Sequence, residues 1–194
     1  MSSIIKVDQI QLADGSTPTA GDLGVTLGSA DLPTGSVLQT IMINPATSTT
    51  DVTSKTWVEI SSDLRATITP INASNTLLLT CTFQFSGRNT NNIQAFKFYN
   101  ITDSAEVNLH TGDGSRTPAH GGIRQKDYDV NDTDVVTITT TVSAGSTSAR
   151  TYGVYSQSER SAASAVTKTF FGNPSNDAAL LIVRPLFTIQ EIAG

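Results

Sequence analysis

Hydrophobic and polar residues alternate along much of this chain with the period of two that is typical of β-strands. The alternation is clearest in Thr76–Ser86, and it recurs in Gln94–Asn100, where Phe96 and Phe98 share one face. The apolar face of the first segment consists of Leu77, Leu79, Cys81, Phe83 and Phe85. We predict that both faces belong to the hydrophobic core.

Short apolar or β-branched runs follow one another along the chain, separated by Gly, Pro, Asn or Asp residues that favour turns. The predicted strands are Ser36–Ile43, Thr56–Ile60, Leu64–Thr69, Thr76–Ser86, Gln94–Asn100, Glu106–His110, Asp134–Val142, Arg150–Ser156, Val166–Phe171 and Leu180–Glu191. Many short strands without helices favour two packed sheets. We therefore predict an all-β fold, a jelly-roll-like two-sheet β-sandwich.

The N-terminal region differs from the rest of the chain. Its Ile4–Leu12 segment has a strand-like pattern, but no strong apolar run follows until Val37, and Pro and Gly residues interrupt the stretch between. We predict an extended N-terminal anchoring arm and linker over residues 1–35 and a sandwich domain over residues 36–194. A lone strand is not stable in water, so the arm needs a partner strand from another protein or a sister subunit. The proposed anchoring residues are Ile4, Ile5, Val7, Ile10 and Leu12.

Composition supports the β prediction and excludes several functions. Serine and threonine make up about a quarter of the chain, and only 15% of residues are charged. The net charge of −5 and the scattered basic residues argue against a nucleic-acid partner, which needs clustered Lys and Arg. No apolar stretch is long enough for a membrane span. The single cysteine, Cys81, permits no intramolecular disulfide and is expected in the core.

The chain shows no catalytic motif. It has only two histidines, His110 and His120, and no nucleophile elbow, zinc-protease motif or P-loop. We therefore predict no enzyme activity, no catalytic residue, no cofactor and no metal site. Two histidines could bind a metal across an oligomer axis, although ordinary loop or strand-end roles are the favoured interpretation.

The segment from Asp127 to Asp134 begins like a calcium loop, with oxygen ligands at alternate positions in Asp127, Asp129 and Asn131. The sixth position is Asp132 instead of Gly, and the twelfth is Ile138 instead of Glu. The favoured interpretation is a solvated acidic loop.

A sugar-stacking surface is a further alternative. Its aromatic side chains would be Trp57, Tyr152, Tyr155, Phe170 and Phe171. Trp57 lies beside Val58 and Ile60 in a predicted strand, so core packing is the favoured role for these rings.

Several segments resemble, in this order, a jelly-roll module of fibre and virion structural proteins from tailed phages, notably marine and cyanobacterial ones. They are GSVLQ (Gly35–Gln39), TWVEISSDLRATITPINASNTLLL (Thr56–Leu79), GDGSRT (Gly112–Thr117), ARTYGVY (Ala149–Tyr155) and LFTIQEIAG (Leu186–Gly194). The opening IIKVDQIQLADGS also resembles the start of such phage proteins.

This resemblance implies a non-enzymatic virion component, a homotrimeric tail or neck fibre attached to the particle by its N-terminal arm. The implied partners are sister subunits and another virion protein such as a tail adaptor, tail or capsid protein. Two alternatives stay open. One is a capsid decoration protein that stabilises the shell, and the other is a host-attachment module that binds a surface glycan.

Overall fold

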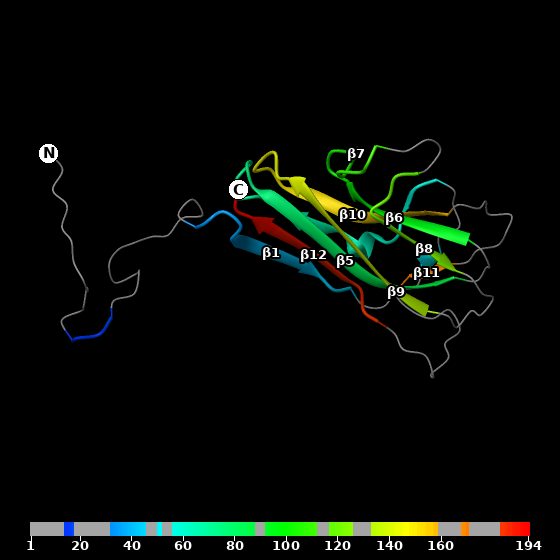
Figure 1. Ribbon diagram of the computed structural model, residues 1–194, viewed down its shortest axis with the longest axis horizontal. Helices are drawn as coiled ribbons and strands as arrows, with labels where there is room; N and C mark the ends of the chain where they lie inside the picture. The colour runs from blue at the N-terminus through cyan, green and yellow to red at the C-terminus, as the bar shows by residue number, and fades with distance from the viewer. Residues whose placement is uncertain are drawn as a thin grey trace.

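Two antiparallel β-sheets packed face to face form the body of the protein (Figure 1). The computed structural model describes residues 14–17, 32–45, 50–51, 56–87, 92–111, 117–125, 133–158, 168–170 and 183–194. Within these residues there is no α-helix, and the one helical turn is a 3-10 turn at Ser62–Leu64. The predicted all-β sandwich is therefore confirmed.

Sheet A is built around the long central strand β5. Its members are β1 (Val37–Ile43), β2 (Thr50–Asp51), β5 (Thr76–Gly87), β9 (Thr133–Ser143), β11 (Lys168–Phe170) and β12 (Leu186–Ile192). β9 pairs with one edge of β5. β12 and then β11 pair with successive parts of the other edge, and β1 and β2 pair with them.

Sheet B is centred on β10 and β6, which pair along most of their length. Its members are β3 (Val58–Glu59), β4 (Ala66–Ile68), β6 (Asn92–Asn100), β7 (Ala105–Glu106), β8 (Gly121–Gln125) and β10 (Arg150–Ser158). The short strands β3 and β4 share the outer edge of β10. β7 and β8 share the outer edge of β6.

The strand order is that of a jelly roll. Short strands that follow one another along the same neighbour can be treated as one interrupted strand. Sheet A then has the order β1/β2, β12/β11, β5, β9, and sheet B has the order β3/β4, β10, β6, β7/β8. Successive strands thus alternate between the two sheets, except that β6 and the following β7/β8 are neighbours in sheet B, and this is the connectivity of two Greek keys.

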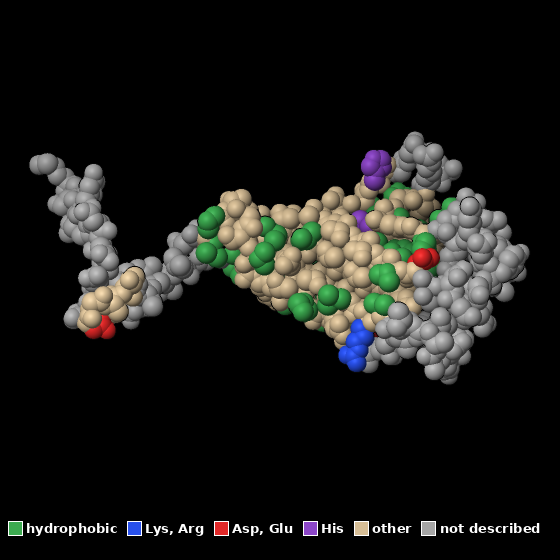
Figure 2. Space-filling model, turned by 60° about the horizontal axis from the view of Figure 1, so that its bottom comes forward, with side chains coloured by type: hydrophobic (Ala, Val, Ile, Leu, Met, Phe, Trp, Pro, Cys, Tyr) green, Lys and Arg blue, Asp and Glu red, His purple; other side chains and the backbone are tan. Residues whose placement is uncertain are grey.

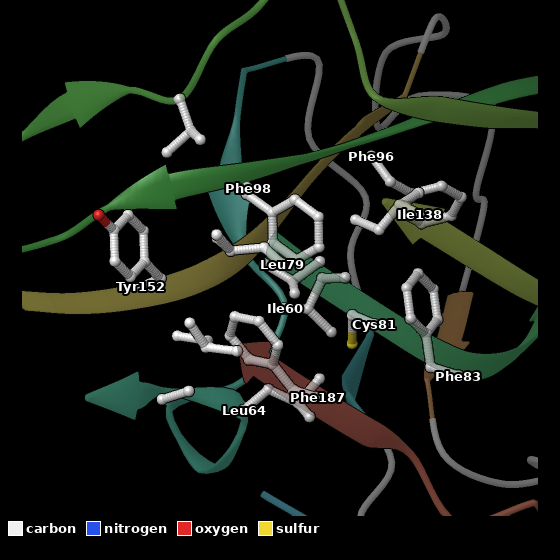
Figure 3. Close-up of a cluster of buried hydrophobic side chains, with 14 of the residues drawn as sticks. Ile60, Leu64, Leu79, Cys81, Phe83, Phe96, Phe98, Ile138, Tyr152 and Phe187 are labelled. Carbon is white, nitrogen blue, oxygen red and sulfur yellow. The ribbon is translucent and has the colours of Figure 1, made fainter. Parts of the chain in front are cut away.

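The core fills the space between the sheets (Figure 3). The predicted face of β5 is buried, with Cys81 and Phe83 both fully inaccessible. Phe83 packs edge-on against Phe96 of β6 with ring centroids 5.0 Å apart. Phe98 stacks on Phe187 of β12 at 5.4 Å. Burial raises the pKa of the Cys81 thiol, which makes this cysteine an unreactive core residue.

Several predicted strands are shorter in the structure. The strand expected at Glu106–His110 ends at Glu106, because Asn108 adopts a positive φ of 36° that an extended strand does not allow. The strand expected from Leu180 begins at Leu186, directly after Pro185, which lacks an amide hydrogen. Residues 180–182 lie outside the described residues.

Two other predicted strands are also cut short. The strand expected at Thr56–Ile60 is reduced to Val58–Glu59. The strand expected at Leu64–Thr69 is reduced to Ala66–Ile68, because Leu64 belongs to the 3-10 turn that the Ser61 side chain caps.

Strands β2 and β8 were not predicted. β8 begins with two glycines, which strands generally disfavour. At Gly121 the chain passes so close to the core that an added Cβ would lie 2.7 Å from Ile138 Cγ2. The close approach explains why a residue without a side chain occupies this strand.

A buried carboxylate joins three segments that lie far apart in the sequence. Glu191 is fully inaccessible, and its oxygens accept hydrogen bonds from the Gln39 and Asn75 side chains at 2.5 and 2.6 Å. The backbone amides of Ile71 and Asn72 also donate to it, at 2.8 and 3.1 Å. Burial raises the pKa of Glu191, but these donors outweigh it, so the pKa lies below its ordinary value.

The chain enters and leaves the sandwich at the same end (Figure 1). The Gly35 amide donates to the Ala193 carbonyl, and the Ala193 amide donates to the Ser36 carbonyl, both at 2.9 Å. Residues 1–31 are therefore connected to the body at the end that holds the C-terminus.

Candidate functional site

Four strands of sheet A, β1, β12, β5 and β9, present an outward surface without charged side chains, which we call the uncharged face. It consists of Thr40, Met42, Leu78, Thr80, Thr82, Val135, Thr137, Thr139, Thr141, Leu186, Thr188 and Gln190. All of these side chains are exposed or half-buried, whereas their neighbours along each strand turn toward the core. The face spans β1, β12, β5 and β9.

Cross-strand threonine pairs hold the middle of the uncharged face. The hydroxyls of Thr82 and Thr137 lie 2.9 Å apart, and those of Thr80 and Thr139 lie 3.3 Å apart. Large apolar side chains lie toward its borders, where Met42 is 64% exposed and Val135 is 58% exposed. In Figure 2, hydrophobic and uncharged polar side chains cover most of the described body that is in view.

The charged residues within the four strands of this face point away from it. Glu191 lies on the inner side of β12, and Asp134 pairs with the core residue Phe85 at the end of β9. The solvent side of the four strands therefore presents only uncharged hydrogen-bonding groups and apolar carbon. Such a face can be covered by another protein without burying a charge.

The outward side of sheet B is different, because charged and aromatic side chains gather on it. Lys97 lies between the core residues Phe96 and Phe98, so its side chain leaves the opposite face of β6. It is nevertheless only 3% exposed, and it forms an ion pair with Glu106, which is 53% exposed. The Lys97 ammonium also lies 4.4 Å from the centre of the Trp57 ring.

A depression of about 530 Å³ opens beside this cluster, and we call it the Trp57 pocket. Its lining residues are Trp57, Lys97, Glu106, Asn108, Leu109, His110, Thr111 and Pro118. The segment after β7 forms one wall, which is tied to sheet A because the Asn108 side-chain amide donates to the Thr141 carbonyl at 3.0 Å. The wall is thus fixed by a contact that reaches across the sandwich.

A second polar group extends the outer surface of sheet B. The guanidinium of Arg65 donates to both oxygens of Glu59, with each distance 2.7 Å. Tyr99 and Tyr155 pack beside them with ring centroids 4.8 Å apart. These groups cover part of the outer side of sheet B with paired charges and aromatic rings.

The two histidines have separate environments. His110 is exposed at the Trp57 pocket. His120 is half-buried against Phe98, whose amide donates to His120 Nδ1 at 3.0 Å. Burial lowers the pKa of His120. Among the described residues, no group of three or more His, Cys, Asp or Glu side chains is placed to hold a metal ion.

The structure separates the aromatic residues that were considered together as a sugar-stacking surface. Tyr152 is fully buried, whereas Tyr155 lies on the outer face of sheet B. The core role expected for Trp57 is wrong, because its ring is half-buried against Lys97 at the pocket. Phe171 and the Phe170 side chain lie outside the described part of the structure.

Other predicted site residues also lie outside the described residues. They are the arm residues Ile4, Ile5, Val7, Ile10 and Leu12 and the acidic-loop residues Asp127, Asp129 and Asn131. The anchoring role of the arm and the solvated state of the acidic loop therefore stay predictions.

Sequence analysis did not single out Lys97 or Glu106. The alternation of β6 does place Lys97 opposite the two phenylalanines, and this was the available signal. Its burial depends on Trp57, a residue forty positions earlier in the chain, and no local pattern reports such a contact.

Comparison of the chain with protein-family models finds no matching family, and comparison with curated proteins finds no match. No helix in the described part of the chain has the length and apolarity needed to cross a membrane.

Proposed function

We propose that this protein is a non-enzymatic structural subunit of a phage particle, a fibre-type component that forms a homotrimer through its uncharged face. The observation that carries the proposal is the uncharged face itself. Monomeric β-proteins normally protect sheet surfaces with charged side chains, and this chain places none on the outer side of four adjoining strands. The phage resemblance of its sequence segments supports the same conclusion.

Electrostatics favour self-association through this face over other surfaces. Each chain carries a net charge of −5, so copies that meet through charged surfaces would repel one another. Contact through the uncharged face brings no like charges together. The exposed side chains of Met42, Val135 and Leu186 add apolar area that gains free energy when it is covered.

The position of the chain's entry suits attachment to a particle. Residues 1–31 join each sandwich at the end where Gly35 and Ala193 are hydrogen bonded. In a trimer with parallel subunits, three arms would leave from one end and bind a virion protein together. Each bound arm would raise the local concentration of the next, so weak individual contacts would suffice.

Two measurements test the proposal. Light scattering of the full chain should give three times the 20.5 kDa mass of one chain, and a monomer at micromolar concentration would contradict the fibre assignment. Replacing Ile4, Val7 and Ile10 with Asp should leave the trimer and its unfolding temperature unchanged but abolish incorporation into particles. Normal incorporation of this variant would contradict the anchoring role of the arm.

A further inference from the structure

The Trp57 pocket has the size and lining of a small-ligand site. Its volume of about 530 Å³ falls in the range of about 300–1,000 Å³ that is usual for such sites. Trp57, Leu109 and Pro118 supply apolar surface on its walls. Glu106, Asn108, His110 and Thr111 bring carboxylate, amide, imidazole and hydroxyl groups to the same space.

Lys97 gives this pocket a fixed geometry. It lies beneath the opening, covered from solvent, and contacts both the Trp57 ring and the Glu106 carboxylate. One buried cation therefore holds an aromatic ring and an acceptor group in place before any ligand arrives. Such pre-organisation reduces the entropy that binding would otherwise cost.

We propose that the Trp57 pocket binds an uncharged pyranose sugar. A pyranose has an apolar C–H surface, which packs on an aromatic ring, and hydroxyl groups at its edge, which need both donors and acceptors. The pocket supplies the ring in Trp57, an acceptor in Glu106 and mixed donor and acceptor groups in His110 and Thr111. This combination matches the two-sided chemistry of a sugar.

The charge distribution selects against acidic sugars. The Glu106 carboxylate is 53% exposed, whereas the ammonium of Lys97 lies behind it on a side chain that is 3% exposed. A ligand in the pocket therefore meets the negative partner of the pair first. A sugar carboxylate would be repelled by the Glu106 carboxylate, whereas an uncharged hydroxyl would not be repelled.

A purely structural role for the cluster would require only Lys97, Trp57 and Glu106. That role explains the contact of the Lys97 ammonium with the Trp57 ring and its ion pair with Glu106. It predicts that the rest of the pocket lining contributes nothing to sugar binding. His110 belongs to that remaining lining and has an exposed side chain, so it separates the two explanations. The sugar proposal does not depend on the fibre assignment or on trimer formation.

The fluorescence of the protein reports directly on this site, because Trp57 is its single tryptophan. The full chain is titrated separately with the methyl glycosides of glucose, galactose, mannose and N-acetylglucosamine, and with glucuronic acid. We expect a saturable change of Trp57 emission for at least one uncharged glycoside, with a dissociation constant in the millimolar range or below. The absence of saturable binding for every uncharged glycoside would overturn the proposal, as would preferred binding of glucuronic acid.

Variants identify the binding groups. His110→Ala removes an exposed side chain and should weaken binding about fivefold, the loss of one ordinary hydrogen bond, with the unfolding temperature unchanged. Glu106→Gln should also weaken binding, and Thr67→Ala, at an exposed threonine outside the pocket lining, serves as the matched control that binds normally. If His110→Ala and Glu106→Gln both bind like the parent protein in saturation-transfer NMR, the pocket is not the sugar site.

Discussion

The two outer faces of the sandwich use charge in opposite ways. Sheet A turns its glutamate, Glu191, inward, and the outer side of its four longest strands carries threonine, glutamine and apolar side chains. Sheet B turns Lys97 and Glu59 outward, where each forms an ion pair. The two sheets enclose the same core, so the difference concerns what lies outside each of them.

This difference indicates a separate role for each face. A surface with paired charges and packed aromatic rings is stable when it is exposed to water. The Trp57 pocket within this surface is suited to a small ligand. A surface without charges gains free energy when another protein covers it. The two proposals accordingly concern different faces, with association between copies proposed for sheet A and ligand binding for sheet B.

The largest expected effect comes from placing a charge on the uncharged face. Thr139→Glu would bury an unpaired carboxylate in each subunit contact, at a cost of about 3–5 kcal/mol, so we expect a monomer at micromolar concentration. Light scattering measures the change. Thr67→Glu is the matched control, because Thr67 belongs to an exposed threonine pair on sheet B, where its hydroxyl lies 2.8 Å from that of Thr151. If both variants have the same mass, the two faces do not differ in the way described.

The second-largest expected effect is the loss of stability when a carboxylate is removed, which we compare for the inward-facing Glu191 and the outward-facing Glu59. Glu191→Ala would remove the acceptor of the buried Asn75 amide and of the partly buried donors of Gln39 and Ile71, so the free energy of unfolding should fall by about 3 kcal/mol. Glu59→Ala breaks only the pair with exposed Arg65 and should cost less than about 1 kcal/mol. Denaturant titration compares them, and equal losses would contradict the structural role of Glu191.

The dependence of stability on acid pH should show the contribution of the Glu191 carboxylate. Its pKa in the folded protein lies below the ordinary value of 4.5, so the unfolded chain takes up the proton first as the pH falls. The stability contributed by this carboxylate is complete above that value and is lost as the pH drops through the folded pKa. Glu191→Gln should lose this part of the pH dependence in unfolding measurements, and an unchanged acid profile would show that Glu191 is not its source.

The smallest expected effect is the loss of stability when His120, which contacts β6 of sheet B, takes up a proton. Burial holds the pKa of His120 below 6.5, and Nδ1 must stay unprotonated to accept the Phe98 amide hydrogen. Lys97 and Glu106 are the charged groups that influence it, and they act in opposite directions. The unfolded chain therefore takes up this proton first, and stability should fall slightly as the pH drops below 6.5, at a higher pH than the loss that comes from Glu191. His120→Asn should remove this step, and its persistence would place the titrating group elsewhere.

The sequence was sufficient for the core but not for the pocket. Alternation in β5 and β6 correctly placed Cys81, Phe83 and Phe98 inside, because the burial of a strand face follows a local period of two. The same rule puts Trp57 and Val58 on opposite faces, and the expected core role of Trp57 disregarded it. Contacts such as that of Trp57 with Lys97 depend on strand pairing across the sheet, which local patterns do not determine.

The positions of the strands likewise include some that the sequence indicates and some that it does not. Pro185 marks a strand boundary that is visible in the sequence, although the prediction extended past it. β8 could not be found by propensity, because Gly121 and Gly122 are required by close packing against Ile138 and the Gln94 carbonyl. The hydrogen bonds to Glu191 likewise come from residues far apart in the chain, so a single glutamate in an apolar strand gave no sign of them.

Protection of Met42 from oxidation tests the central claim, that the uncharged face joins copies of this chain, most directly. Met42 is 64% exposed in the single chain, and Ile93 on sheet B is 41% exposed and serves as the internal reference. Hydroxyl-radical labelling of the full chain is measured by mass spectrometry at high and at low protein concentration. We predict that Met42 is protected at high concentration and reactive on dilution, while Ile93 reacts equally in both. Equal reactivity of Met42 at both concentrations, in a preparation that light scattering shows to be trimeric, would contradict the claim.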